Sequence, residues 1–254
     1  MKIFICTDAE GVSCLDKKEL INGFTMQMRS RLMADVNAAI RGAFDGGADE
    51  VVVIDGHSGG KNFLPGELDV RAVQITGDAL TQLDADAVFM IGTHAMSGTA
   101  NAFYDHTQCS ETWHDYFLNG RRGGEMLQMG AWAGVYGVPV VMVSGDLAAC
   151  AEAREFFGNI RTACVKYGID HHNAECLPAE KAEQLIYQAA KEAIGIVPQI
   201  RPYRVNLPAE IVVEFNRTDH CSDVLKAVPS LEQLDGRTVR KVSKEIRAYV
   251  DVLL

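Results

Sequence analysis

Lys2-Ile3-Phe4-Ile5-Cys6-Thr7-Asp8-Ala9-Glu10-Gly11 is the stretch that decides how the chain folds. Its apolar run predicts a buried strand, and the strand ends at two carboxylates separated by one small residue. In an extended segment, side chains two residues apart point the same way, so Asp8 and Glu10 are expected to project together. Two carboxylates so close repel each other unless a proton or a cation lies between them. The stretch therefore predicts either a capped turn with solvated acids or one half of a cation site.

The length and composition are those of an ordinary globular protein. The 254 residues are 48% hydrophobic and 23% charged, which suits one large α/β domain or two small ones. The net charge of −10 argues against nucleic acid or an anionic membrane as a partner, because phosphate groups are bound by basic patches. The chain has no apolar run of signal-peptide or transmembrane length, and its seven scattered cysteines form no Cys-x-x-Cys pair. Reduced thiols and a cytoplasmic location are therefore expected.

The next elements alternate between helices and strands. Hydrophobic periodicity and apolar runs predict a helix over 26–44, a strand over 50–54, a short helix near 78–83, strands over 87–91 and 138–143, and a helix over 147–157. A strand, a helix and a second strand in that order form a βαβ unit with parallel pairing and a right-handed crossover. Most of these strands are continuous apolar runs, which indicates helices on both faces of the sheet.

An antiparallel hairpin interrupts this parallel scheme. Residues 111–118 are rich in aromatic side chains and run into Asn119-Gly120, the strongest short-range hairpin signal. The chain then returns through Arg121-Arg122-Gly123-Gly124 to a helix that is expected to begin at Glu125. The predicted fold class is therefore α/β, with a mostly parallel sheet, helices on both of its faces and an inserted antiparallel hairpin.

The last part of the chain is predicted to form a smaller α+β portion. A helix over 178–195 ends at Gly195, and the prolines that follow place a boundary between residues 197 and 198. This gives an α/β domain over 1–197 and a C-terminal portion over 198–254, with the alternative that both belong to one domain. Within the C-terminal portion we expect strands over 210–215 and 238–242, and helices over 223–227 and 243–254, the last with Ser243 as N-cap.

Four potential ligands directly follow the first three strands. Asp8 and Glu10 follow the first, His57 the second and His94 the third. In open α/β sheets ligands bind at the carboxyl ends of the strands, so these side chains are expected to converge. Carboxylate oxygen and imidazole nitrogen suit zinc, manganese or another divalent ion. With Glu125 as a fifth candidate the set exceeds what one catalytic zinc takes, which favours two metals bridged by a carboxylate, Asp8 being the better candidate.

Each of these residues also has a purely structural interpretation when it is taken alone. His57 and His94 can be polar loop residues, and Glu125 can be a first-turn acid favoured by the helix dipole. Their joint occurrence after successive strands favours the metal site, and Asp55 is then expected to orient His57. The histidines outside this pattern are interpreted as surface or packing residues, namely His114, His171, His172 and His220.

Four short segments carry a family resemblance. They are Thr7-Asp8-Ala9-Glu10-Gly11, Ile54-Asp55-Gly56-His57-Ser58, Gly92-Thr93-His94-Ala95 and Gly124-Glu125-Met126. In their order and spacing, up to about residue 190, the chain resembles the D-aminopeptidase family of dinuclear metallopeptidases (peptidase family M55). The resemblance implies a ring-like homo-oligomer, such as a decamer, and a catalytic histidine at His106. It also implies two zinc ions held by Asp8, Glu10, His57, His94 and Glu125.

Together these observations predict hydrolysis of the N-terminal residue of a short peptide, with D-configured residues implied by the resemblance alone. A metal-bridged water, with its pKa lowered to about 7, is expected to attack the carbonyl. His106 would either donate a proton to the leaving amine or stabilise the oxyanion. Two alternatives stay open. One is another dinuclear hydrolase, such as an amidase or a phosphoesterase that binds phosphate through Lys61, Arg121 or Arg122, and the other is a non-catalytic module that binds metal or peptide.

Overall fold

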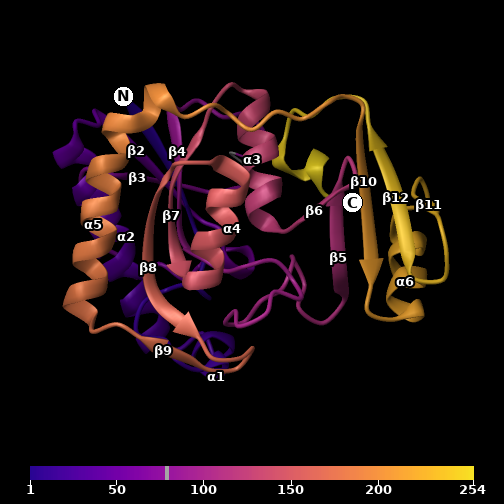
Figure 1. The fold of residues 1–254 in the computed structure, drawn as a ribbon, viewed down its shortest axis with the longest axis horizontal. Coiled ribbons are helices and arrows are strands. Elements are labelled where there is room, and N and C mark those ends of the chain that lie inside the picture. The colour runs from indigo at the N-terminus through magenta and orange to yellow at the C-terminus, as the bar shows by residue number, and fades with distance from the viewer. Residues whose placement is uncertain (78–79) are drawn as a thin grey trace.

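Two β-sheets lie side by side along the long axis of the molecule (Figure 1). The computed structural model describes residues 1–77 and 80–254. The larger sheet has the strand order β3-β2-β1-β4-β7-β8-β9, and its described strands pair in parallel except for β9, which is antiparallel to β8. Its strands are β1 (Lys2–Thr7), β2 (Glu50–Asp55), β3 (Val73–Ile75), β4 (Ala87–Thr93), β7 (Val140–Asp146), β8 (Arg161–Gly168) and β9 (Ala174–Cys176).

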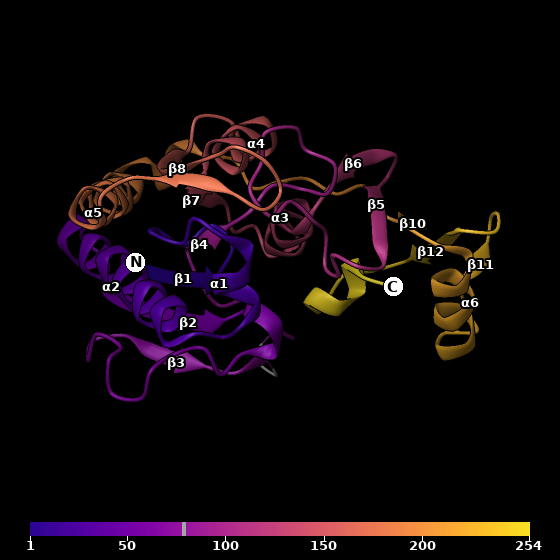
Figure 2. The same cartoon turned by 90° about the horizontal axis from the view of Figure 1, so that it is seen from below.

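Helices cover both faces of the parallel sheet, as predicted. Figure 2 shows the sheet edge-on, with α2 and α5 on one side and α3 and α4 on the other. Along β1, Ile3 and Ile5 are buried towards α2 and α5, whereas Phe4 between them is buried in the cluster that contains α3 and α4. A strand with apolar residues on both faces needs helices on both sides. The helices are α2 (Met26–Gly46), α3 (Glu125–Val135), α4 (Leu147–Phe157) and α5 (Ala179–Ile196).

The predicted βαβ opening is confirmed. The Thr25 side chain caps α2 by accepting a hydrogen bond from the backbone of Met28, and Gly47 ends the helix in a left-handed conformation. The three-residue edge strand β3 was not predicted, because so short a segment has no periodicity to recognise. The predicted strand over 138–143 is displaced towards the C-terminus and forms β7. The short helix expected near 78–83 begins at residues that lie outside the described part of the chain.

The predicted hairpin forms, but its strands belong to a second, five-stranded sheet. Strand β5 pairs with β6 and also with β10 of the C-terminal portion, in the order β11-β12-β10-β5-β6. The hairpin therefore shares a sheet with strands beyond residue 197, and the division of the chain into 1–197 and 198–254 stays a prediction. The strands are β5 (Trp113–Leu118), β6 (Arg121–Gly123), β10 (Ala209–Phe215), β11 (Glu232–Gln233) and β12 (Thr238–Ser243).

The expected helix over 243–254 was wrong. Ser243 is the last residue of β12, and its hydroxyl donates to the backbone of Asp251 rather than capping a helix. The Asp251 carboxylate accepts the backbone N–H groups of Arg247 and Ala248, which fixes the single 3₁₀ turn η4 (Tyr249–Val252) against α3. The remaining short elements are α1 (Lys18–Asn22), η1 (His57–Gly59), η3 (Val197–Gln199) and α6 (Thr218–Ala227).

The strand order reverses between β1 and β4, and this reversal places the functional site. The chain passes outwards from β1 to β2 and β3, then returns to the other side of β1 to begin β4. Such a reversal leaves a crevice at the carboxyl ends of the two central strands. The loops after β1 and β4 lie so close that a Cβ atom on Gly11 would meet the Thr93 carbonyl, and one on Gly92, at φ +76°, would meet the Asp8 carbonyl.

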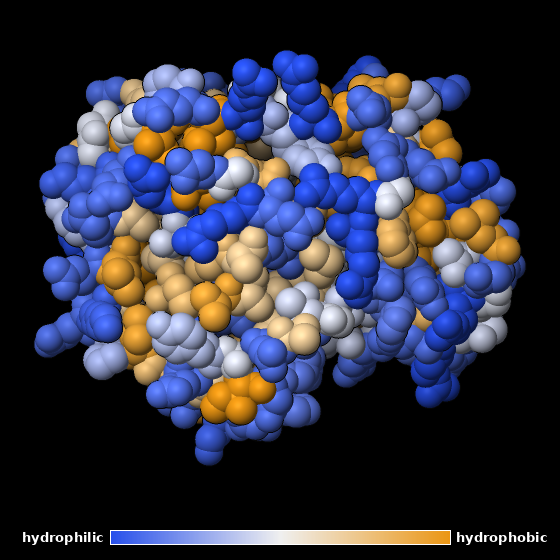
Figure 3. Space-filling model, in the orientation of Figure 1, coloured by the Kyte–Doolittle hydropathy of each residue, from blue (hydrophilic) through white to orange (hydrophobic). Residues whose placement is uncertain are grey.

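One face of the molecule carries mainly polar groups (Figure 3). Hydrophilic side chains cover most of the face drawn in Figure 3, with smaller apolar clusters between them. Among the described residues, no helix combines the length and the apolar character needed to cross a membrane.

Candidate metal centre

The five predicted ligands lie together at the crevice, and four of them, Asp8, Glu10, His57 and Glu125, line a cavity of about 560 Å³. Asp8, Glu10 and His57 form one group, in which the possible ligand atoms are within 4.8 Å of one another. A second group with the same spacing contains His94, Glu125 and also His106. The loop after β1, the turn η1, the end of β4 and the first turn of α3 supply the five predicted ligands.

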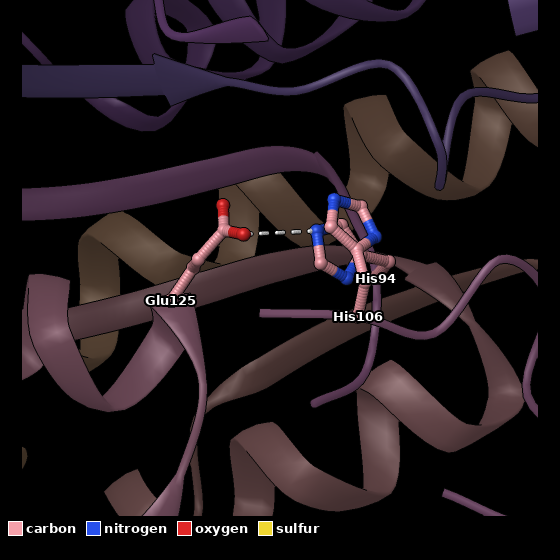
Figure 4. Close-up of side chains that lie close together, drawn as sticks. All are labelled: His94, His106 and Glu125. Carbon is pink, nitrogen blue, oxygen red and sulfur yellow. Dashed lines mark ion pairs between the residues drawn. The ribbon is translucent and has the colours of Figure 1, made fainter. Parts of the chain in front are cut away.

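Asp8 lies between the two groups. Its Oδ1 is 3.2 Å from Nδ1 of His57, and its Oδ2 is 3.4 Å from Nε2 of His94. Each imidazole faces a second carboxylate as well, since Glu10 lies 3.3 Å from His57 and Glu125 lies 3.4 Å from His94. Figure 4 shows the Glu125 carboxylate facing the His94 ring. Asp8 thus offers one oxygen to each group, as a bridging carboxylate does.

The His94 ring has a nitrogen that fits a bound cation. Its Nδ1 lies 2.9 Å from the Ala95 carbonyl, so Nδ1 carries the hydrogen and donates it. Its Nε2 is buried and has no hydrogen-bond partner among the described residues, although it is directed at Asp8 and Glu125. Metal-binding histidines usually donate one ring N–H to a carbonyl or carboxylate and bind the ion through the other nitrogen. The donor set therefore fits a divalent ion on this side.

The shifted pKa values of the buried acids and imidazoles indicate that the site favours positive charge. Burial and the charge of Glu10 raise the pKa of Asp8 to about 7. Burial alone would lower the pKa of His57, but Glu10 and Asp8 outweigh burial and raise it to about 11. Burial would likewise raise the pKa of Glu125, but His94 outweighs it and lowers the pKa to about 2. In the metal-free protein the imidazoles thus hold protons that neutralise the carboxylates.

Zinc binding to the metal-free protein is expected to release protons. At pH 7.5, His57 and His94 must each give up a proton before they bind an ion, so about two protons should appear per fully loaded chain. Because the pKa of His57 is about 11, the release should decline as the pH approaches that value, and zinc affinity should rise with pH. Calorimetric titration in buffers of different ionisation enthalpy measures this number. A His172→Ala variant, changed at an exposed histidine, should release the same number of protons per chain. If neither protein releases protons on zinc binding, the imidazoles are not protonated in the metal-free site.

Buried polar groups hold the ligand loops from behind. Lys166 is fully buried, and its Nζ donates to the backbone carbonyls of Glu10 at 2.9 Å and Leu15 at 2.7 Å. Asp55 acts indirectly rather than on the His57 ring as predicted. Its carboxylate accepts from Asn62, whose side-chain amide donates to the His57 carbonyl at 2.8 Å. The positions of Glu10 and His57 are therefore set by the backbone that carries them.

His106 lies against the second group. Its ring stacks on that of His94, with centroids 3.9 Å apart and planes inclined by 9° (Figure 4). Its Nδ1 lies 2.9 Å from the Tyr104 carbonyl and donates to it, so Nε2 is left for another partner. Burial, followed by the charge at His94, lowers the pKa of His106 and favours the neutral ring. The ring is thus placed either to exchange a proton or to act as a sixth ligand.

The profile of the D-aminopeptidase family (Peptidase_M55) matches residues 1–254. The chain belongs to the D-aminopeptidase family. The match continues through the C-terminal portion, beyond the limit near residue 190 that the sequence motifs indicated. A D-aminopeptidase of Bacillus subtilis (strain 168) is 32% identical over 213 residues, covering 80% of this chain and 77% of the relative. The fold of a solved structure, a Zn-dependent D-aminopeptidase DppA from Bacillus subtilis, described as a self-compartmentalizing protease, matches with a TM-score of 0.92 and 28% identity, covering 100% of this chain and 96% of that one.

Several residues that line the cavity of this D-aminopeptidase family member were not predicted. Asn22 is the last residue of α1, Phe24 lies in the turn between α1 and α2, and Tyr249 comes from η4 of the C-terminal portion. Cys6 also lines the cavity. The position of Cys6 was predictable, because it lies two residues before Asp8 on the same side of β1. The other residues reach the site only through tertiary packing.

The remaining histidines lie away from the metal groups. His114 lies near Asp115 and Glu214, but those two carboxylates form ion pairs with Arg122 and Arg237. His171 lies 2.7 Å from Asp105, in the segment just before His106. Neither His114 nor His171 is among the described residues that line the cavity.

Proposed function

We propose that the protein is a metal-dependent aminopeptidase that removes the N-terminal residue of short, D-amino-acid-containing peptides and uses two zinc ions. The observation that carries the proposal is the position of Asp8, with one oxygen towards each of two ligand groups. Membership of the D-aminopeptidase family supports the activity, and the zinc dependence stated for DppA supports the choice of metal. The ligands would be Asp8, Glu10 and His57 for one ion, and Asp8, His94 and Glu125 for the other.

When bound, two such ions acidify a water molecule and polarise the scissile carbonyl. The proton transfer is assigned to His106. With Nδ1 donating to Tyr104, the neutral ring offers the lone pair of Nε2, so it accepts a proton first and can then donate it to the leaving amine. A neutral ring has no N–H at Nε2 to offer an oxyanion, which favours the acid–base role. Partial burial of the His106 ring strengthens these electrostatic effects.

The charges of the cavity favour a peptide amine over a phosphate ester. Four carboxylates line it, those of Asp8, Glu10, Glu111 and Glu125, and its described lining contains no lysine or arginine. Of the cations considered for phosphate binding, Arg121 pairs with Glu155 and Arg122 pairs with Asp115. Lys61 is likewise absent from the described lining. Since Asp8, Glu10 and Glu125 would be neutralised by the two ions, the Glu111 carboxylate is left to attract the ammonium group of a peptide N-terminus, and the described lining offers no lysine or arginine to a phosphate dianion.

Metal removal tests this function. Elemental analysis of the purified protein should find about two zinc ions per chain, as a bridged centre requires. Chelation should abolish the hydrolysis of D-alanyl amides and peptides, and added zinc should restore it. L-configured substrates and a generic phosphate ester are assayed in parallel. Faster turnover of the phosphate ester would favour the phosphoesterase, whereas zinc-loaded protein without any turnover would favour a binding module.

The same comparison supports a proposal about the assembly. DppA is described as a self-compartmentalizing protease, which supports a closed homo-oligomer for this chain. A ring of ten subunits and a cytoplasmic location remain finer proposals. Light scattering distinguishes the ring from a monomer. A monomer would overturn the proposed assembly without affecting the proposed chemistry.

A further inference from the structure

The cavity has an exposed rim and a buried apolar floor. At the rim, Phe24 is 50% exposed, and Ser58 and Glu111 are also exposed. At the floor, Met90 is only 5% exposed and Met129 only 3%. The cavity is therefore open to solvent on the rim side, and the two methionines belong to its buried lining, together with Thr7, Glu10 and Thr93.

The floor residues Cys6 and Met129 lie on the elements that carry metal ligands and point to the same side as those ligands. Cys6 precedes Asp8 by two residues on β1 and is paired in register with Met90 of β4. Met129 follows Glu125 by four residues, so both project from the same face of α3. The floor is thus the continuation of the ligand set into the space between α3 and the parallel sheet.

Tyr249 closes one side of the floor. Its backbone N–H donates to the Leu80 carbonyl at 2.9 Å, and its hydroxyl donates to the Gln128 side chain at 3.2 Å. Both Leu80 and Tyr249 line the cavity. The floor is made of Cys6, Leu80, Met90, Met129 and Tyr249, and among the residues that the structure describes it contains no charged side chain.

We infer that this floor is the pocket for the side chain of the substrate's N-terminal residue, and that it selects an apolar side chain. The inference rests on the proposed aminopeptidase activity. An enzyme that removes a single N-terminal residue must place that residue at the closed end of its cavity, while the rest of the peptide leaves through the open rim. A charged side chain would be buried at the floor without a partner, which is strongly unfavourable.

The pocket predicts a ranking of substrates. A series of aminoacyl amides of one configuration, varied at the N-terminal residue, should show alanyl and leucyl substrates preferred over aspartyl and lysyl ones by about 100-fold or more in kcat/KM. Shortening Met129 to Ala enlarges the floor, so the leucyl-to-alanyl ratio of kcat/KM should rise about 10-fold. Tyr249→Leu, at a partly exposed position, is a second variant that widens the pocket with less disturbance of the core.

Met33→Ala is the matched control. Met33 is a buried methionine of α2, 2% exposed, on the opposite face of the sheet and outside the described lining of the cavity. This variant should leave the leucyl-to-alanyl ratio unchanged even if its stability falls. An unchanged ratio in both Met129→Ala and Tyr249→Leu would overturn the pocket.

A second substrate series separates the pocket from the function. The second series consists of dipeptides that differ only at the residue after the scissile bond. For these dipeptides, the ratio of kcat/KM between a leucyl and an alanyl leaving residue should be the same in Met129→Ala as in the wild type. A shift confined to this second series would assign the floor to the leaving residue and overturn the inference. If zinc-loaded wild type hydrolyses none of the aminoacyl amides, the proposed function itself fails, whereas turnover with unshifted ratios refutes the pocket alone.

Discussion

Replacement of Asp8 by Asn is expected to remove both metal ions and to abolish hydrolysis. The change keeps the shape of the side chain but removes the charge that the two ligand groups share through Oδ1 and Oδ2. Metal affinity should fall by more than about 100-fold, which is the upper limit for replacing a residue that only orients a metal ligand through a hydrogen bond. Elemental analysis after dialysis against a zinc buffer measures the loss directly, and peptide hydrolysis should fall with it.

The same variant has a second signature that does not depend on activity. Burial and Glu10 raise the pKa of Asp8 to about 7 in the metal-free protein, so the folded state holds this proton more tightly than the unfolded state. Above pH 7 the deprotonated Asp8 destabilises the metal-free fold, because the unfolded chain ionises this group more easily. Metal-free Asp8→Asn should therefore have a higher Tm than metal-free wild type at pH 8.5, and the difference should shrink towards pH 5.

The control is Asp16→Asn, the same substitution at an exposed aspartate near the end of the same loop. Its metal content should equal that of the wild type. Retention of two ions by Asp8→Asn would show that the centre is not built around a shared carboxylate. Loss of one ion only would make Asp8 a ligand of a single metal.

Replacement of His106 by Ala is expected to lower kcat by about 10²- to 10⁴-fold, the range of a lost acid–base residue, with both metal ions retained. The reason is the position of its ring, stacked on His94 with Nδ1 bound to Tyr104 and Nε2 available. Because burial lowers its pKa, the acid limb of the wild-type kcat profile should lie below the ordinary histidine value of about 6.5. Steady-state kinetics and metal analysis at each pH separate this limb from loss of metal.

His106→Gln distinguishes the two catalytic roles. A glutamine amide donates a hydrogen bond to an oxyanion but does not carry a proton at neutral pH. A glutamine variant as slow as the alanine variant supports proton transfer, whereas substantial recovery supports oxyanion stabilisation. Loss of one metal ion in His106→Ala would instead identify His106 as a ligand, which its distance from Glu125 and His94 allows.

The convergence of the ligands was predictable because it follows from chain direction. Parallel strands end at one edge, so Asp8, His57 and His94, each just past a strand, had to meet there. The two-residue period of a strand also placed Asp8 and Glu10 together. Local sequence is sufficient for such deductions, since each depends on one strand and its polarity.

The partners of the hairpin and of the C-terminal segment were not predictable in this way. Asn119-Gly120 specifies a tight turn, but it does not specify that β5 will also pair with β10, about a hundred residues later. Likewise, Ser243 precedes a segment that mixes apolar and polar residues, which is typical of the start of a helix. In the fold, Ser243 ends a strand and Asp251 caps the turn that follows. Which distant segments pack together decides these cases, and it also brings Tyr249 to the cavity.

The contact between the loops after β1 and β4 matters for redesign of this enzyme. Gly11 and Gly92 let the two loops meet backbone to backbone, with the N–H of Gly11 donating to the carbonyl of Gly92 at 2.7 Å. The frame of the centre is therefore main chain, and side chains only project from it. A protein engineer can exchange ligands or floor residues to recruit other metals or substrates on an unchanged frame. The two glycines are the positions to leave alone, because any Cβ there would push the loops apart.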